Sequence, residues 1–257
     1  MKKIFVLIFA SMLCATTFAQ RNVQPQRGGG RSAKPGLAQK KNSFYLGLKA
    51  GVDFSTMTQP DQCDLYKGAG VGFSGSVAGK VRFGQATPNA PAGTGLLGVG
   101  LELKYKQNTV KTNGTNESGK TNANLSMGYF EVPVYLQLYP FYKSDAMNTF
   151  YVELGPDFAG ILSRSPKSLT VDNLTGDFSS VTYVINKDGS KLKGMDFRLM
   201  AGIGYDFAIK NEKGEASNLI GINARYYLGT SGFAKNFNSK MSSFEISLSW
   251  MFNIGKL

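Results

Sequence analysis

The sequence predicts an all-β fold: an eight-stranded antiparallel up-and-down transmembrane β-barrel with a plugged polar lumen. Three observations lead to this prediction. From residue 43 onward, apolar and polar residues alternate in eight separate segments, which is the period of a β-strand with two different faces. No segment after the first twenty residues has the period of a helix. The connections tend to alternate between long and short, as the external loops and periplasmic turns of outer-membrane barrels do.

The chain divides into three parts. Residues 1–19 have the pattern of a signal peptide: Lys2 and Lys3, then the apolar run IFVLIFASMLCATT, then a small residue before Gln20. Residues 20–42 are rich in Gly, Pro, Gln and basic residues, which predicts a disordered basic periplasmic tail. Residues 43–257 form the predicted barrel. Eight of the 29 basic residues precede residue 43 and no acidic residue does, so the barrel has 21 basic and 17 acidic residues.

The first four alternating segments are residues 44–54, 71–83, 97–106 and 128–140. Each presents one apolar face, such as Phe44, Leu46 and Leu48 in the first segment. The opposite face is polar or made of glycine. In residues 128–140 Pro133 interrupts the alternation on the side of Glu131. Because proline has no N–H to donate, we expect a gap in one ladder there, at a bulge.

The last four segments are residues 150–162, 195–207, 219–228 and 244–252. Their apolar faces continue the pattern, ending with Leu248, Trp250 and Phe252. Aromatic residues gather near the strand ends, where rings can sit at membrane interfaces. A soluble β-sandwich would also alternate, but it would not need these aromatic positions.

The polar faces carry balanced charge, which favours a closed lumen in which charges pair. Eight strands leave an interior just wide enough for side chains to fill, so no open pore is expected. The predicted lumen charge network comprises Lys49, Lys80, Arg82, Glu102, Lys104, Glu131, Glu153, Asp157, Arg198, Arg225 and Glu245. Lys106, Asp53 and Asp196 share the same faces.

A family resemblance rests on four of these segments. YFEVPVYLQLY (129–139) resembles a strand typical of the PorT-like outer-membrane β-barrel proteins of Bacteroidota. FYVELGPDFAGIL, DFRLMAGIGYDF, INARYYLGTSG and a last strand ending in an aromatic residue follow at similar spacing, and the signal ending Phe-Ala-Gln fits the same bacteria. The resemblance covers residues 43–257 and implies an outer-membrane barrel. It does not imply one function, although PorT itself belongs to type IX protein secretion.

No motif predicts a catalytic, cofactor or metal site. The chain has no histidine, the usual base of the small barrel enzymes. Glu102, Glu131 and Glu153 are candidates for a carboxylate mechanism, but interior salt bridges explain them better. Gly70–Gly75 matches Gly-x-Gly-x-x-Gly without the following helix that a nucleotide site needs. Residues 172–177 lack the ligands of a complete calcium loop, and Cys63 is a lone loop thiol.

We therefore expect a non-enzymatic protein of the cell outer membrane with a structural or interaction role. Its expected partners are outer-membrane lipid, and proteins that contact the external loops or residues 20–42. Nucleic acid is not expected, because the chain is exported and its basicity lies mostly in the tail. Two alternatives stay open: a component of type IX protein secretion, and a small-solute channel.

Overall fold

The computed structural model describes residues 42–58, 65–87, 90–116, 118–165, 169–171, 181–183, 195–210, 216–230 and 239–256. The predicted signal peptide, almost all of the predicted tail, Cys63 and residues 172–177 lie outside these ranges. Residues Lys40–Leu257 form one compact unit, to which all the described residues belong. No helix in the described part of the chain is long and apolar enough to cross a membrane.

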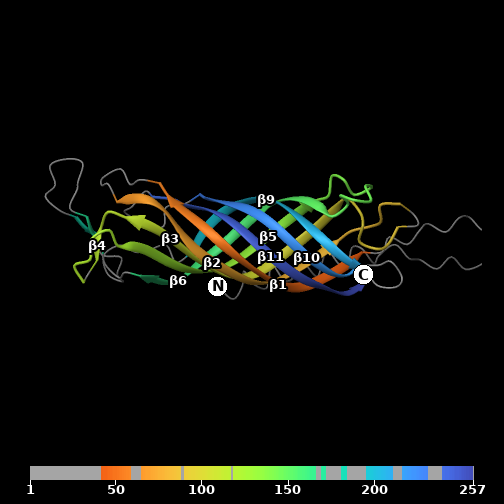
Figure 1. The fold of residues 1–257 in the computed structure, drawn as a ribbon, viewed down its shortest axis with the longest axis horizontal. Helices are drawn as coiled ribbons and strands as arrows, with labels where there is room; N and C mark the ends of the chain where they lie inside the picture. The colour runs from red at the N-terminus through yellow and green to blue at the C-terminus, as the bar shows by residue number, and fades with distance from the viewer. Residues whose placement is uncertain are drawn as a thin grey trace, which may run out of the picture. The chain divides into compact units, whose positions relative to one another are not determined.

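Eight long strands close into an antiparallel barrel, which confirms the predicted fold (Figure 1). The barrel order is β1-β11-β10-β9-β6-β5-β3-β2, and β1 pairs with β11 to close it. The strands are β1 (Ser43–Met57), β2 (Tyr66–Arg82), β3 (Leu97–Thr112), β5 (Asn124–Leu138), β6 (Phe150–Ser165), β9 (Met195–Lys210), β10 (Ala216–Gly229) and β11 (Met241–Lys256).

The two ends of the barrel differ. The terminal end is where β1 begins and β11 ends, and it carries the connections 83–96, 139–149 and 211–215. The loop end carries connections 58–65, 113–123, 166–194 and 230–240. The alternation of lengths is not strict, because connection 83–96 is longer than connection 58–65. At the loop end β4 (Thr115–Asn116), β7 (Leu169–Val171) and β8 (Val181–Tyr183) form a small separate sheet, which we did not predict.

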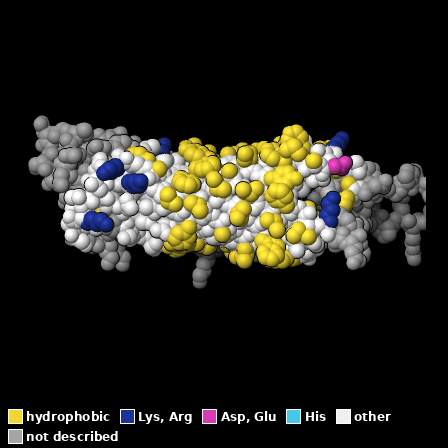
Figure 2. Space-filling view, in the orientation of Figure 1, with side chains coloured by type: hydrophobic (Ala, Val, Ile, Leu, Met, Phe, Trp, Pro, Cys, Tyr) yellow, Lys and Arg dark blue, Asp and Glu magenta, His cyan; other side chains and the backbone are white. Residues whose placement is uncertain are grey.

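The outer wall of the barrel is a band of apolar side chains (Figure 2). Leu48, Leu154 and Leu248 are 63%, 63% and 62% exposed, and their neighbours along each strand point inward. Such exposure of apolar side chains would be unfavourable in water but is favourable in the hydrocarbon of a membrane. A closed barrel suits this environment because it leaves no strand edge unpaired. The apolar face of every predicted strand therefore points outward.

Toward the loop end the polarity of the two faces is inverted. Here the inward side chains are apolar and form a buried cluster: Met57, Leu65, Val110, Ala123, Leu125, Met127, Tyr129, Ala159 and Met241. The outward residues of the same stretch of β3 and β5 are polar, including Thr109, Lys111 and Asn124. Strands of 14 to 17 residues exceed the roughly 9–11 residues that cross a bilayer. We infer that the loop end stands in water, where an apolar interior is favourable. We did not predict this cluster.

Pro133 lies on the lumen side of β5 and is buried. The β3–β5 ladder lacks pairs between Leu101↔Val134 and Lys104↔Glu131, the stretch in which Pro133 lies. The register is the same on both sides, so the gap is not the bulge we expected; the ladder is interrupted without an inserted residue. The register shift of β5 against β6 lies at Gly128/Tyr129 instead. A second gap in the β5–β6 ladder coincides with Gly155 and Pro156.

A charged substitution in the apolar outer band should change the stability of the barrel more than the same substitution on the loop-end exterior. We predict that Leu248→Arg, near the middle of β11, lowers the free energy of unfolding by about 2–4 kcal/mol, because it places a cation in hydrocarbon. Asn124→Arg, at the exposed start of β5, should change it by less than about 0.5 kcal/mol. Urea unfolding in lipid vesicles, followed by the fluorescence of the single tryptophan, measures both. Equal losses would contradict the proposed position of the membrane.

Candidate functional site: the barrel lumen and its terminal-end pocket

The polar face of each strand points into the lumen. The structure places all eleven predicted network residues there, and all are buried: Lys49, Lys80, Arg82, Glu102, Lys104, Glu131, Glu153, Asp157, Arg198, Arg225 and Glu245. Asp53, Lys106 and Asp196 join them. Asp206 is also buried in the lumen and was missed, although the alternation of β9 places it on the same face as Asp196 and Arg198.

Arg225 on β10 is the centre of the network. Its Nη2 lies 2.8 Å from Glu102 Oε1, and its Nε lies 2.5 Å from Glu153 Oε1. Lys49 Nζ lies 2.7 Å from the same oxygen of Glu102, which also accepts a hydrogen bond of 2.9 Å from the Tyr135 hydroxyl. Two cations and two carboxylates are thus joined across the lumen. Buried charges are tolerated when they are paired and hydrogen-bonded in this way.

A second group of ion pairs lies nearer the loop end. Lys104 pairs with Glu245 and donates a hydrogen bond of 2.8 Å to the Tyr227 hydroxyl. Lys106 Nζ lies 2.8 Å from Asp53 Oδ1 and donates to Ser243 Oγ at 2.6 Å. These contacts join β3 to β1, β10 and β11, none of which is its neighbour in the barrel. The pairs therefore brace the barrel across its interior.

The third group holds Arg198, Glu131 and Asp196. Arg198 Nη1 lies 2.6 Å from Glu131 Oε1, and its Nε lies 3.1 Å from Asp196 Oδ2. Asp157 stands opposite Arg198 in the β6–β9 register, yet neither of its carboxylate oxygens has a hydrogen-bond partner within the described residues. The structure thus brings Asp157 to the network without an ion pair shorter than 4.0 Å among those residues.

Tyrosine rings fill the space between the charges. Tyr135 lies under both Lys49 and Arg225, whose charged groups are 5.5 and 4.7 Å from its ring centroid. Gly100 makes room for this ring, since a Cβ there would lie 2.3 Å from it. Gly204 does the same for Tyr151, at 2.4 Å. Small residues on one strand therefore accommodate large ones on the next, as a filled eight-stranded interior requires.

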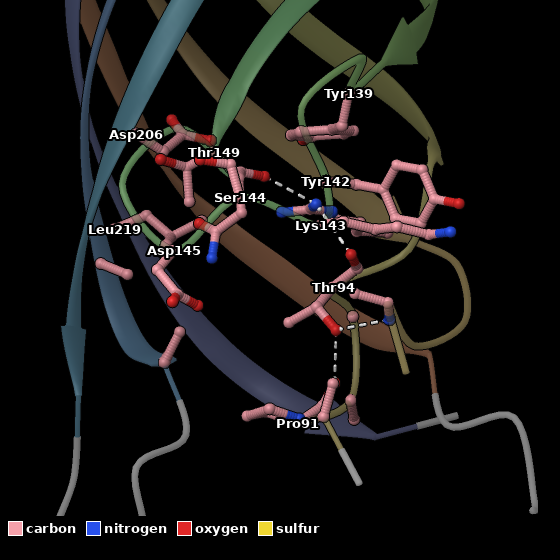
Figure 3. Close-up of a pocket in the computed structure, with 18 of the residues that line it drawn as sticks. Pro91, Thr94, Tyr139, Tyr142, Lys143, Ser144, Asp145, Thr149, Asp206 and Leu219 are labelled. Carbon is pink, nitrogen blue, oxygen red and sulfur yellow. Dashed lines mark hydrogen bonds between the residues drawn. The ribbon is translucent and has the colours of Figure 1, made fainter. Parts of the chain in front are cut away.

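A pocket of about 350 Å³ lies at the terminal end of the barrel (Figure 3). Its lining comes from the ends of β1, β2, β9 and β10 and from connections 83–96 and 139–149. Figure 3 shows Asp206 and Tyr139 at the inner side of the pocket and Pro91 at its outer side. Lys80 and Asp206 form an ion pair at the base.

Arg82 belongs to the wall of this pocket and not to the carboxylate pairs. Its guanidinium donates to the carbonyl oxygens of Gly95, Thr94 and Asn148 at 2.9, 3.0 and 2.7 Å. It also lies 3.7 Å from the centroid of the Tyr139 ring. Arg82 thus ties two terminal-end connections to the barrel wall.

The described residues offer no cluster of metal ligands. Within those ranges no group of three or more His, Cys, Asp or Glu residues is placed to hold a metal ion. Lys106 and Ser243 are in hydrogen-bond contact, but both are buried in the lumen, toward the loop-end apolar cluster. The chemistry that the lumen supports is charge pairing.

We expect strong energetic coupling between the members of the charge network. Arg225→Met should lower the free energy of unfolding by about 3–5 kcal/mol, because it leaves the buried Glu153 without its cation. Adding Glu153→Gln should recover part of this loss, since Glu102 keeps Lys49. Lys111→Met on the exterior is the matched control, with a change below about 0.5 kcal/mol. Unfolding in lipid vesicles measures these variants together with Glu153→Gln alone, and strictly additive losses in the double variant would contradict the network.

Compared with known proteins, the chain has no match in sequence among the curated ones. Among solved structures, the Neisserial surface protein NspA is 11% identical with a TM-score of 0.42 and covers 82% of this chain and 97% of its own. OprG from Pseudomonas aeruginosa is 12% identical with a TM-score of 0.42, covering 84% and 95%. Ail of Yersinia pestis, in complex with a heparin analogue, is 13% identical with a TM-score of 0.36, covering 81% and 99%.

Because these TM-scores lie below 0.5, we infer nothing about this chain from the individual structures. The family comparison is more extensive. Residues 18–238 match the family model described as the outer membrane protein beta-barrel domain, and these residues make up well over half of the chain. The closed eight-stranded barrel and the apolar outer band agree with that match. The chain belongs to the outer membrane protein β-barrel domain family and is a protein of the outer membrane.

Proposed function

We propose that this barrel is a non-enzymatic interaction protein, which contacts partners through its loop end and its basic tail. The observation that supports the proposal most is the filled lumen. Ion pairs cross its middle, and the apolar cluster around Met127 and Met241 closes it toward the loop end. The lumen of such a barrel has no passage, and lipid covers its outer wall. Its connecting segments are therefore the parts that can contact other molecules.

The loop end is the side that we expect to face the outside of the cell. In outer-membrane barrels the short turns are periplasmic, and the longest connection here, 166–194, is at the loop end. The polar exterior of this end carries Lys67, Lys111, Lys120 and Lys240, all exposed. Among the described residues, every carboxylate except that of Asp145 is buried. The described exterior of the loop end is therefore basic, which would favour acidic partners.

A role in type IX protein secretion is the second candidate. It rests on the resemblance of residues 129–139 and the following strands to the PorT-like barrels. The buried Pro133 and the Gly155-Pro156 pair are the positions at which the ladders of β5 are interrupted, and both belong to the segments that carry the resemblance. In this reading the tail of residues 20–42 would contact periplasmic components of the secretion machinery.

A small-solute channel is the third candidate and the one that conductance tests directly. We predict that the full-length protein, purified and inserted into planar bilayers, gives no steady ion current, because paired charges and apolar side chains fill the lumen. A large open porin in the same bilayers serves as the positive control. Reproducible currents that persist across independent preparations would contradict the filled lumen and favour the channel.

Affinity purification from the native outer membrane tests the interaction role of the tail and the role in type IX secretion. We predict that the full-length chain retains specific partners that a chain lacking residues 20–42 loses, because the tail carries six basic and no acidic residues. Heat-modifiable migration on gels confirms that both versions are folded. Identical partners for the two would leave the tail without a docking role. Retention of type IX cargo in a deletion strain would support the secretion reading.

A further inference from the structure

The second and third groups of lumen ion pairs together contain more carboxylates than cations. Among the described residues they comprise three cations, all buried: Lys104, Lys106 and Arg198. Five buried carboxylates accompany these cations: Asp53, Glu131, Asp157, Asp196 and Glu245. If all five were ionised, two negative charges would be buried without a cation, which is strongly unfavourable. The central group around Arg225 has no such excess, because it joins two cations to two carboxylates.

Asp157 on β6 is the carboxylate of this set that is left without a partner. It is fully buried, and neither of its carboxylate oxygens has a hydrogen-bond partner among the described residues. Arg198 stands directly opposite in the β6–β9 register, but its Nη1 and Nε contact Glu131 and Asp196. A buried carboxylate without a cation or a donor is so unfavourable that it takes up a proton and becomes neutral.

The groups that face Asp157 come from both neighbouring strands and from the opposite wall of the lumen. The charged and titratable residues among them are Glu131 and Tyr129 on β5, Arg198 and Asp196 on β9, and Lys104 and Lys106 on β3. Both lysines already have a carboxylate partner on another strand. The Tyr129 hydroxyl is directed at the sulfur atoms of Met127 and Met241. These neighbours therefore leave Asp157 without a cation, and Glu131 adds a second negative charge beside it.

One proton on Asp157 would also supply the hydrogen-bond donor that this group lacks. Three buried acceptors have no partner, both oxygens of Asp157 and Glu131 Oε2, against one such donor, Arg198 Nη2. Protonated Asp157 has an O–H donor and keeps an acceptor oxygen. Arg198 Nη2 can then donate to Asp157, and the Asp157 O–H can donate to Glu131 Oε2. Glu131 lies diagonally across the β5–β6 ladder, since it pairs with Ala159, and a diagonal neighbour is within reach of a long side chain.

Asp157 lies where the charge network meets the loop-end apolar cluster. Ala159 and Tyr129 belong to that cluster, and each is the next inward residue beside Asp157 or Glu131 on its strand. From this geometry we propose that Asp157 is a proton-binding site, which carries a proton at neutral pH and lets the apolar cluster close over the charge network. Loss of the proton at higher pH would place a charge against the apolar cluster, so the stability of the closed lumen depends on pH.

Urea unfolding of the full-length chain in lipid vesicles at several pH values tests the proposal. An unfolded aspartate loses its proton near about pH 3.9, so above that pH the folded barrel binds one proton more than the unfolded chain. The folding constant then falls as the pH rises, by up to about tenfold per pH unit, until folded Asp157 ionises. Asp157→Asn has no such proton, so the ratio of its folding constant to that of the wild type should rise with pH. Asp145→Asn, at an exposed carboxylate, is the matched control and should give a constant ratio. A constant or falling ratio for Asp157→Asn would overturn the proposal.

Infrared spectroscopy detects the proton in the folded protein itself. A protonated carboxyl has a C=O stretching band at higher frequency than a carboxylate, and the band shifts in D₂O. We expect this band in the folded wild type at neutral pH, its loss in Asp157→Asn and its retention in Asp145→Asn. A band that remains in Asp157→Asn would place the proton on another carboxyl and overturn the assignment. If Asp157→Asn does not fold, the wild type alone decides: absence of the band at neutral pH overturns the proposal.

Discussion

The whole structure depends on one constraint: in hydrocarbon every backbone N–H and C=O must be paired within the protein. A sheet satisfies this only when it closes, and closure of β1 on β11 removes the last free edge. Eight strands then enclose a narrow interior, and side chains on the inward face have to fill it. The apolar outer band, the charge network and the tyrosines between the charges all follow from this closure.

Charged side chains can fill a narrow lumen only if they are paired with side chains of opposite charge. Arg225 reaches Glu102 and Glu153, Arg198 reaches Glu131, and Lys104 reaches Glu245. Each pair joins strands that are not neighbours, so it spans the interior instead of following the sheet. Removing one partner would leave a buried charge alone, which is more unfavourable than losing a surface pair. The lumen is therefore a structural core made of polar groups.

The barrel also changes environment along its length. In the middle the charges are inside and leucine, isoleucine and phenylalanine are outside. Toward the loop end Met127 and Leu125 turn inward while Asn124 and Lys111 face outward. The inversion indicates that lipid surrounds the first region and water the second. The closed interior and the exposed loop end are the features on which the proposed interaction role rests, while the terminal end keeps a pocket of its own.

The sequence by itself determined the eight strands, the direction of their faces and the positions of the inward charges, because the period of two is a local property of each strand. Asp206 was predictable by the same rule and was overlooked. Only the tertiary structure decided which charges meet, as in Lys80 with Asp206 or Arg225 with Glu102, because strand register and closure bring distant residues together. It also decided that Asp157 lacks an ion pair within 4.0 Å among the described residues, that Pro133 interrupts a ladder without a bulge, and that a pocket forms where several strand ends converge.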